Sequence, residues 1–366
     1  MNEIRIEKIM SVLGKVKDPD LNKDLVSLGM IKDLRVEGVN VIFKVELTTP
    51  ACPLKDKIKS DCINAIRSEL PEVKEIKIEM TSKVSAHSDT RKDAVLPGVK
   101  NTIAVASGKG GVGKSTVAVN LAVALAKLGA KVGLIDADIY GPSIPLMLGV
   151  KGKPKIMQDM VSQKMVPIEN YGIKLMSIGF LIDSSDPVIW RGPMASGAIK
   201  QFMSDVEWGE LDYLFFDLPP GTGDIQLTLV QTIPLTGAII VTTPQDVSVI
   251  DARKGLKMFE RVNVPVFGII ENMSYFITPD TGKRYDIFGN GGGRKLSEEL
   301  NTEFLGEIPI DPRICEGGDL GKPIVYELNG TEHENRILEI SKNLAAQVSI
   351  TNINSKTPKI EINLGN

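Results

Sequence analysis

The chain has 366 residues, enough for about two domains at roughly 150 residues each. Apolar residues make up 42% and charged residues 24%, which is a globular composition and excludes a disordered chain or a collagen-like fibre. Lys and Arg number 43 against 46 for Asp and Glu, so the net charge of −3 gives no global support for nucleic-acid binding. Three cysteines and two histidines are too few for a disulfide framework or an imidazole-rich metal site.

The first ten residues lack the basic stretch and apolar core of a signal peptide. No apolar run approaches the roughly 20 residues needed to cross a bilayer. We therefore expect a cytoplasmic protein whose partners are neither membranes nor nucleic acids.

Residues 1–80 predict a small α+β domain. Apolar residues recur at helical spacing in 2–16 and again in 54–69. Between these helices, Glu37–Asn40 reads as a hairpin turn, followed by a strand in which Val41, Phe43, Val45 and Leu47 alternate with polar residues. A third strand at 74–80 completes the order α-β-β-α-β.

The remaining chain predicts a larger α/β domain at 101–350, joined by a polar linker at 81–100 and followed by a loose tail at 351–366. Apolar strand runs alternate there with helical stretches. Near-continuous apolar runs indicate strands buried on both faces, so we predict a doubly wound, mostly parallel sheet. The expected strands are Thr102–Ala106, Lys131–Ile135, Tyr213–Phe216, Ala238–Val241 and Val266–Ile270.

A glycine-rich phosphate-binding loop follows the first of these strands. Residues 108–115 fit G-x-x-x-x-G-K-[ST], with a strand before them and the predicted helix Ser115–Leu128 after them, which is the context of a P-loop. We expect Lys114 to reach the β and γ phosphates of ATP and the Ser115 hydroxyl to ligate Mg²⁺. The residues expected to surround the nucleotide are Gly108, Lys109, Gly110, Gly111, Val112, Gly113, Lys114, Ser115 and Thr116.

Three aspartates end predicted strands and are candidates for the catalytic centre. Asp136 and Asp138 follow the second strand, and Asp217 ends the strand Tyr213–Phe216 in the Walker B manner that holds Mg²⁺. Carboxylates at the carboxyl ends of parallel strands face the ligand crevice. A single aspartate there is more often a helix cap, but three in register with a P-loop favour phosphate chemistry.

Lys109, inside the glycine run, makes K-G-G-x-G-K-S resemble the deviant P-loop of the MinD, ParA, ArsA and nitrogenase iron-protein class. The resemblance implies a homodimer in which Lys109 reaches the nucleotide of the other subunit. It also implies that Asp138 positions the attacking water, that Asp136 helps to hold the metal shell, and that Asn272 reads the adenine base. A solvated loop lysine and a turn-forming asparagine are the alternatives for Lys109 and Asn272.

Further motifs resemble the Mrp/ApbC family of iron–sulfur cluster carrier ATPases over residues 100 to about 345. The first 80 residues are similar to the small iron–sulfur assembly domain often fused to that family. Together they imply an ATP hydrolase that binds iron–sulfur clusters and transfers them to apoproteins. The motifs are Asp18–Asp20, Ser27–Gly29, Leu47–Pro53, Asp136–Ser143, Trp190–Met194, Leu218–Asp224, Glu271–Ser274, Phe288–Gly293 and Glu316–Pro323.

The cysteines depart from the family pattern. The family usually carries C-x-x-C after E-N-M-S and holds a [4Fe–4S] cluster across the dimer, whereas this chain has Thr278 and Thr281 there. Neutral hydroxyls are poor ligands for iron–sulfur clusters, so the cluster site does not carry over. Cys52, between a strand and a helix, is the candidate cluster ligand, with a buried apolar role as its alternative. We expect Cys62 in the core and see no thiol partner for Cys315.

Two other functions stay open. A MinD- or ParA-like positioning ATPase would need a basic amphipathic C-terminal helix or a basic surface, and neither is apparent. A cluster-free ATPase that regulates iron–sulfur assembly is consistent with the threonine pair.

Overall fold

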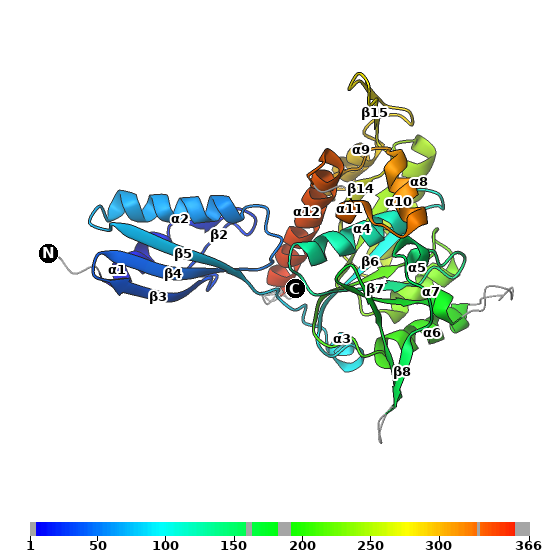
Figure 1. Ribbon diagram of the computed structural model, residues 1–366, viewed down its shortest axis with the longest axis horizontal. Coiled ribbons are helices and arrows are strands. Elements are labelled where there is room, and N and C mark those ends of the chain that lie inside the picture. Colours follow the sequence, from blue (N-terminus) through cyan, green and yellow to red (C-terminus); the bar gives the residue numbers. More distant parts are fainter. Residues whose placement is uncertain (1–4, 159–162, 182–191, 328–329, 356–366) are drawn as a thin grey trace, which may run out of the picture. The chain divides into compact units, whose positions relative to one another are not determined.

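The computed structural model describes residues 5–158, 163–181, 192–327 and 330–355 (Figure 1). The chain forms two compact units. The small unit comprises Met1–Ser85 with Ala345–Asn366, and the large unit comprises Ala86–Leu344.

The small unit confirms the predicted order α-β-β-α-β, with two additional two-residue strands after the first helix. Strand β4 pairs antiparallel with β3 and parallel with β5. Helices α1 and α2 pack on one face of this sheet. The elements are α1 (Ile6–Leu13), β1 (Lys17–Asp18), β2 (Lys23–Asp24), β3 (Ile31–Glu37), β4 (Asn40–Leu47), α2 (Lys55–Glu69) and β5 (Glu75–Ser82).

The alternation along β4 determines which face of the small sheet is buried. Val41, Phe43, Val45 and Leu47 are at most 2% exposed, as predicted, while the residues between them are half-buried. The turn that joins β3 to β4 passes through Gly38 at a φ of +64°, a conformation that favours glycine.

The large unit is built on an eight-stranded sheet in the order β10-β11-β7-β12-β6-β13-β14-β17, in which only β10 runs antiparallel to its neighbour. This confirms the mostly parallel α/β fold. The strands of the unit, including two hairpins outside the sheet, are β6 (Val99–Ser107), β7 (Val132–Asp136), β8 (Lys155–Gln158), β9 (Gln163–Val166), β10 (Ile168–Asn170), β11 (Ile173–Ser177), β12 (Leu211–Asp217), β13 (Gly237–Thr242), β14 (Val266–Glu271), β15 (Phe276–Ile277), β16 (Arg284–Tyr285) and β17 (Phe304–Glu307).

Helices of the large unit connect these strands. The helical elements are α3 (Thr90–Val95), α4 (Lys114–Lys127), α5 (Ile144–Met147), the 3₁₀ turn η1 (Ile178–Phe180), α6 (Gly192–Ser204), α7 (Asp224–Thr232), α8 (Asp246–Arg261), α9 (Gly292–Glu299), α10 (Pro312–Leu320), α11 (Ile324–Glu327) and α12 (Glu332–Ser355), which continues into the small unit. Within the described ranges, no helix combines the length and the apolarity that a membrane span requires.

The path of the chain through the sheet places a ligand crevice beside β6. From β6 the chain moves outward through β7 to β11, returns to β12, and then moves the other way through β13, β14 and β17. Because parallel crossovers are right-handed, this reversal places α4 and α5 on one face and α6 to α9 on the other. The carboxyl ends of β6, β7 and β12 therefore meet at a topological switch point, where ligands bind in folds of this kind.

Three segments differ from the sequence-based expectation. The polar stretch expected as a linker at 81–100 contains α3 and the first residues of β6. There the fully buried Lys92 donates from Nζ to the backbone carbonyls of His87 (2.6 Å) and Lys100 (2.8 Å), which fixes a segment that looks solvated in sequence. Helix α12 continues to Ser355, past the expected start of the tail at 351. Residues 356–366 and the motif residues Trp190 and Arg191 lie outside the described ranges.

Candidate active site

The phosphate-binding loop joins the carboxyl end of β6 to the first residue of α4. Gly111 and Gly113 have φ values of +81° and +78°, which L side chains rarely adopt. A Cβ on Gly108 would lie 2.1 Å from the carbonyl carbon of Asp251, and one on Gly113 would lie 2.2 Å from Asn272 Nδ2. Close packing at Gly108, backbone conformation at Gly111, and both at Gly113 therefore require glycine at these three positions of the loop.

Lys114 is buried at the centre of the site, with 6% of its surface exposed. Its Nζ lies 2.7 Å from Asp217 Oδ1 and 3.3 Å from Asp138 Oδ2. Burial by itself would lower the pKa of Lys114, but the charges of Asp217 and Asp138 outweigh burial and raise it. The ammonium therefore stays charged, as a phosphate ligand must.

Ser115 and Asp217 place two oxygen ligands side by side. The Ser115 hydroxyl donates to Asp217 Oδ2 at 2.5 Å, and Asp217 is fully buried at the end of β12. Burial raises the pKa of Asp217, while Lys114 and Ser115 oppose that rise. Hard oxygen ligands of this kind suit Mg²⁺, which takes one or two protein oxygens and completes its shell with phosphates and water.

Asp136 has a different environment from Asp138. Its carboxylate accepts from Ser177 Oγ at 2.9 Å and from the amides of Asp138 and Ile144, each at 3.3 Å. Burial, followed by the charge of Asp217, raises the pKa of Asp136 to about 8. These bonds hold the loop that presents Asp138, so the structure favours a supporting position for Asp136. Its predicted place in the metal shell stays a prediction.

Lys109 lies in the same loop with a half-buried side chain. Its carbonyl accepts from Ser107 Oγ at 2.9 Å, which anchors the backbone at this point. Among the residues that the structure describes, none forms an ion pair with its ammonium group. A role in a second subunit is compatible with this position and stays a prediction.

Asn272, at the end of β14, contacts the loop rather than open space. Its Nδ2 donates to the carbonyl of Val112 at 2.8 Å, and its side chain is buried. This bond holds the backbone of the P-loop from the adjacent strand end. The expected contact with adenine stays a prediction, and support of the loop is a role that sequence reasoning missed.

The turn after Asp217 is tied to the P-loop strand. Gly221 donates its amide to the Ser107 carbonyl at 2.9 Å, and the position of a Cβ on Gly110 would be 3.9 Å from the Pro220 ring. A glycine-rich turn in this place can change its conformation when a γ-phosphate binds or is lost, as switch loops do.

Glu271 is a buried residue that connects several segments beside the site. In the sequence it stood out only as part of the E-N-M-S motif. It is 0% exposed and accepts from Ser274 Oγ and from the Gly293 amide, each at 2.6 Å. Ser274 Oγ also lies 3.2 Å from Glu307, which pairs with Arg284 at 3.3 Å. The end of β14 is thus connected to the base of the β15–β16 hairpin. The one sequence signal was an acidic residue at the end of an apolar strand.

The threonine pair lies on that hairpin, which projects from the large unit (Figure 1). The hydroxyl oxygens of Thr278 and Thr281 are 2.6 Å apart, so the two side chains meet although neither carries sulfur. No group of three or more His, Cys, Asp or Glu side chains in the described ranges could hold a metal ion.

The three cysteines lie in different environments, and no disulfide joins them. Cys62 is 0% exposed in the core, as predicted, and burial raises the pKa of its thiol to about 12. Cys315 is exposed and lies within helix α10, whose first residue is Pro312. Cys52 is half-buried between β4 and α2.

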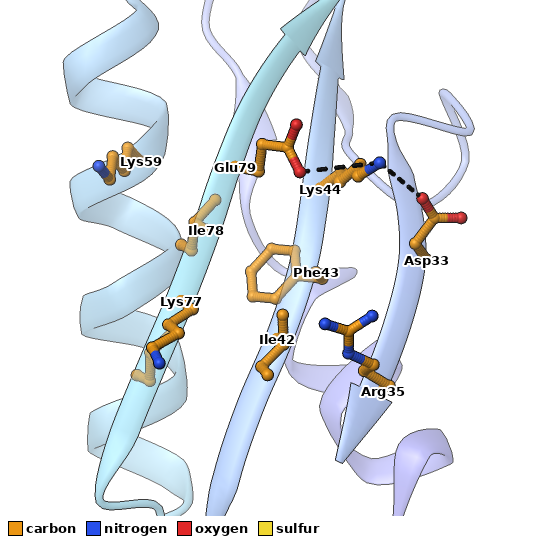
Figure 2. Close-up of a pocket in the computed structure, with 10 residues that line it drawn as sticks. Asp33, Arg35, Ile42, Phe43, Lys44, Lys59, Lys77, Ile78 and Glu79 are labelled. Carbon is orange, nitrogen blue, oxygen red and sulfur yellow. Dashed lines mark ion pairs between the residues drawn. The ribbon is translucent and has the colours of Figure 1, made fainter. Parts of the chain in front are cut away.

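A hollow of about 610 Å³ lies on the small unit, where strands β3, β4 and β5 present side chains together (Figure 2). Lys44 lies between Asp33 and Glu79, with Nζ to oxygen distances of 3.1 Å and 3.7 Å. Arg35 pairs likewise with Glu37 at 3.2 Å. Lys44 and Arg35 are thus paired with carboxylates, and no serine, threonine, cysteine or histidine is among the described residues that line the hollow, so the candidate active site is the P-loop.

Comparison with known proteins agrees with the geometry. A family described as NUBPL iron-transfer P-loop NTPase matches residues 98–345, which is more than half of the chain. This chain belongs to that family. A second family, described as iron–sulfur cluster assembly protein, matches residues 6–79, which run from the start of α1 into β5 of the small unit.

Relatives of this family member share most of its length. An iron–sulfur cluster carrier protein of Synechocystis is 51% identical over 346 residues, covering 94% of this chain and 98% of the relative. A nucleotide-binding protein of Archaeoglobus fulgidus, solved with ADP, is 43% identical with a TM-score of 0.56, covering 64% of this chain and 92% of that one. The cell division ATPase MinD of Pyrococcus furiosus is 20% identical with a TM-score of 0.50, covers 67% and 98%, and shares the fold.

Proposed function

We propose that this P-loop NTPase works as a homodimer that hydrolyses Mg-ATP and carries iron–sulfur clusters to apoproteins. The observation that carries the ATPase part is the convergence of Lys114, Ser115, Asp138 and Asp217 from three strand ends onto one buried cluster. The cargo is proposed from the family and from the carrier relatives, which match nearly the whole chain.

The first step of the proposed mechanism is the binding of phosphates by Lys114. Its charge is balanced by Asp217 and Asp138. When ATP binds, its β and γ phosphates take over as partners of the ammonium group, while the loop amides donate hydrogen bonds to further phosphate oxygens. The site needs little rearrangement because burial and hydrogen bonds already hold these groups in place.

Ser115 and Asp217 are the residues that would hold Mg²⁺. A bound Mg²⁺ ion supplies charge neutralisation at the β and γ phosphates. Asp138 then orients the attacking water, and Asp136 holds the backbone of Asp138 in place through the 3.3 Å bond from its amide. Lys109 stabilises the charge that develops on the phosphates in the other subunit, in the manner of an arginine finger.

The cluster part of the proposal depends on thiolates. Cys62 is excluded by burial, which leaves Cys52 and Cys315 as the sulfur ligands that one chain can supply. Cys52 is the proposed cluster ligand because it lies in the part of the chain that matches an iron–sulfur assembly family.

A second candidate is a cluster-free ATPase that regulates cluster assembly. The specific observation in its favour is the Thr278–Thr281 hydroxyl pair, which stands where the family resemblance predicts thiolates.

Two assays test the proposal on the full chain. Phosphate release should require Mg²⁺ and should be lost in Lys114→Ala but kept in Lys131→Ala, which removes an exposed lysine outside the site. Anaerobic reconstitution followed by incubation with an apo acceptor should transfer iron and sulfide together. ATP hydrolysis without any cluster transfer would favour the regulatory candidate, and wild-type turnover in Lys114→Ala would contradict the ATPase site.

A further inference from the structure

A groove of about 450 Å³ separates helices α7 and α8, apart from the P-loop crevice. One wall carries Lys254, Lys257 and Arg261, at a spacing of three and four residues that places them on one helix face. Leu227 of α7 and Met258 of α8 form apolar parts of the lining. None of the described lining residues is acidic, so the groove combines apolar surface with charged side chains that are all positive.

The charges of this groove are only partly balanced by the protein. Lys254 pairs with Asp251 of its own helix at 2.9 Å. Among described residues, no ion pair is formed by Lys257 or Arg261, both of which are exposed. Elsewhere on the same helix, Val247 and Ile250 are 66% and 55% exposed. The outer face of α8 therefore offers apolar side chains near its start and free cations near its end.

Both walls of the groove belong to segments that also contact the P-loop or the strand before it. Thr222, which lines it, belongs to the glycine-rich turn after Asp217. Helix α8 packs against the P-loop so closely that a Cβ on Gly108 would lie 2.2 Å from the Asp251 carbonyl oxygen. An occupant of the groove would therefore contact two segments that also pack against the P-loop or the end of the strand before it.

We propose that this groove between α7 and α8 is a docking site for an acidic protein segment with apolar side chains between its carboxylates. Charge complementarity favours carboxylates opposite Lys257 and Arg261, and the apolar lining favours leucine-like side chains over a sugar-phosphate backbone. A nucleic acid would need a longer track of cations than three residues on one helix provide. The proposal goes beyond ATP hydrolysis and cluster transfer, and its test depends on neither activity.

The test uses the full chain and a short fluorescein-labelled peptide of Glu and Leu, with binding followed by fluorescence anisotropy. We expect binding that weakens with added salt and a Kd about tenfold higher in the double variant Lys257→Glu with Arg261→Glu. The matched control is Lys151→Glu with Lys155→Glu, which makes the same charge change at exposed residues outside the groove and should leave the Kd unchanged. Melting temperatures check that the variants fold. If the double glutamate variant does not fold, the double variant Lys257→Gln with Arg261→Gln takes its place.

Three results would overturn the proposal. The first is equal peptide affinity in the wild type and the groove variant. The second is tighter binding of a single-stranded oligonucleotide than of the peptide, lost in the same variant. The third is loss of ATP-dependent dimers in the groove variant, measured by sedimentation, because the groove would then be covered by a second copy of this chain.

Discussion

Asp136 and Asp138 show how two carboxylates two residues apart take different positions. Asp136 is 0% exposed, and three donors occupy its oxygens. Asp138 accepts from the Tyr140 amide at 3.2 Å through one oxygen, and its other oxygen faces Lys114. One carboxylate therefore holds the loop, and the other is directed at the centre of the site.

The substitution Asp138→Ala should leave ATP binding intact and reduce turnover by about 100-fold or more, because the phosphate cradle remains while the water loses its partner. Binding and phosphate release are measured separately on the same preparation. Asp136→Ala serves as the contrast, since it should lower the free energy of unfolding by about 1–3 kcal/mol by leaving buried donors without an acceptor. An equal loss of binding and turnover in Asp138→Ala would point to a structural role.

Asn272→Ala separates two roles for one side chain. If the amide supports the P-loop through Val112, its loss should lower the affinity for adenine and guanine nucleotides by the same factor. It should also lower the free energy of unfolding by about 1 kcal/mol. If the amide reads adenine, only the adenine nucleotide should lose affinity. We predict the first pattern, and titration with ADP and GDP decides between them.

At the scale of elements, apolar patterning predicted the five central strands because each is buried on both faces. Strand β12 is an example, with Leu214, Phe215 and Phe216 all 0% exposed. Strand β11 was not predicted, since Lys174 interrupts its apolar run. In the structure the Lys174 ammonium reaches the carbonyl of Trp208 at 2.7 Å, which allows a lysine in a sheet strand.

The end of α12 was missed for a related reason. Residues 351–355 read as polar loop, yet Asn352 is 0% exposed and donates to the Ser85 carbonyl at 2.9 Å. Within the candidate site, the spacing of motifs identified Lys114, Ser115 and the aspartates, because strand ends meet at a known edge of the sheet. The amide bond from Asn272 to Val112 depends on tertiary packing and has no local signature.

The β15–β16 hairpin is an element whose geometry can be tested by restoring sulfur. The hydroxyls of Thr278 and Thr281 are already 2.6 Å apart, so Thr278→Cys with Thr281→Cys should bring two thiols together without moving the backbone. We predict that the double variant takes up an iron–sulfur cluster on anaerobic reconstitution, measured as iron and sulfide per dimer. A single Thr278→Cys variant is the control and should bind much less. A double variant that folds and dimerises but binds no iron would contradict the inferred geometry.

At the scale of the whole molecule, the proposed role of Lys109 depends on a second subunit. Lys109→Ala should keep ATP affinity but reduce hydrolysis by about 1000-fold, as loss of a charge supplied in trans would. Mixing it with Lys114→Ala tests this, because one of the two sites in a mixed dimer then has both its own Lys114 and Lys109 from the other subunit. We predict partial recovery of phosphate release. No recovery at any mixing ratio, with heterodimers demonstrated, would argue against action in trans.

The central claim is that this family member carries a cluster although its hairpin has threonines. The most direct measurement is iron and sulfide content of the full chain after anaerobic reconstitution, compared with Cys52→Ser and with the Thr278→Cys, Thr281→Cys variant as a positive control. We predict that the wild type retains iron and sulfide in equal amounts, resistant to a chelator, and that Cys52→Ser loses both. A wild type that holds no more iron than Cys52→Ser, under conditions where the positive control is loaded, would contradict the account.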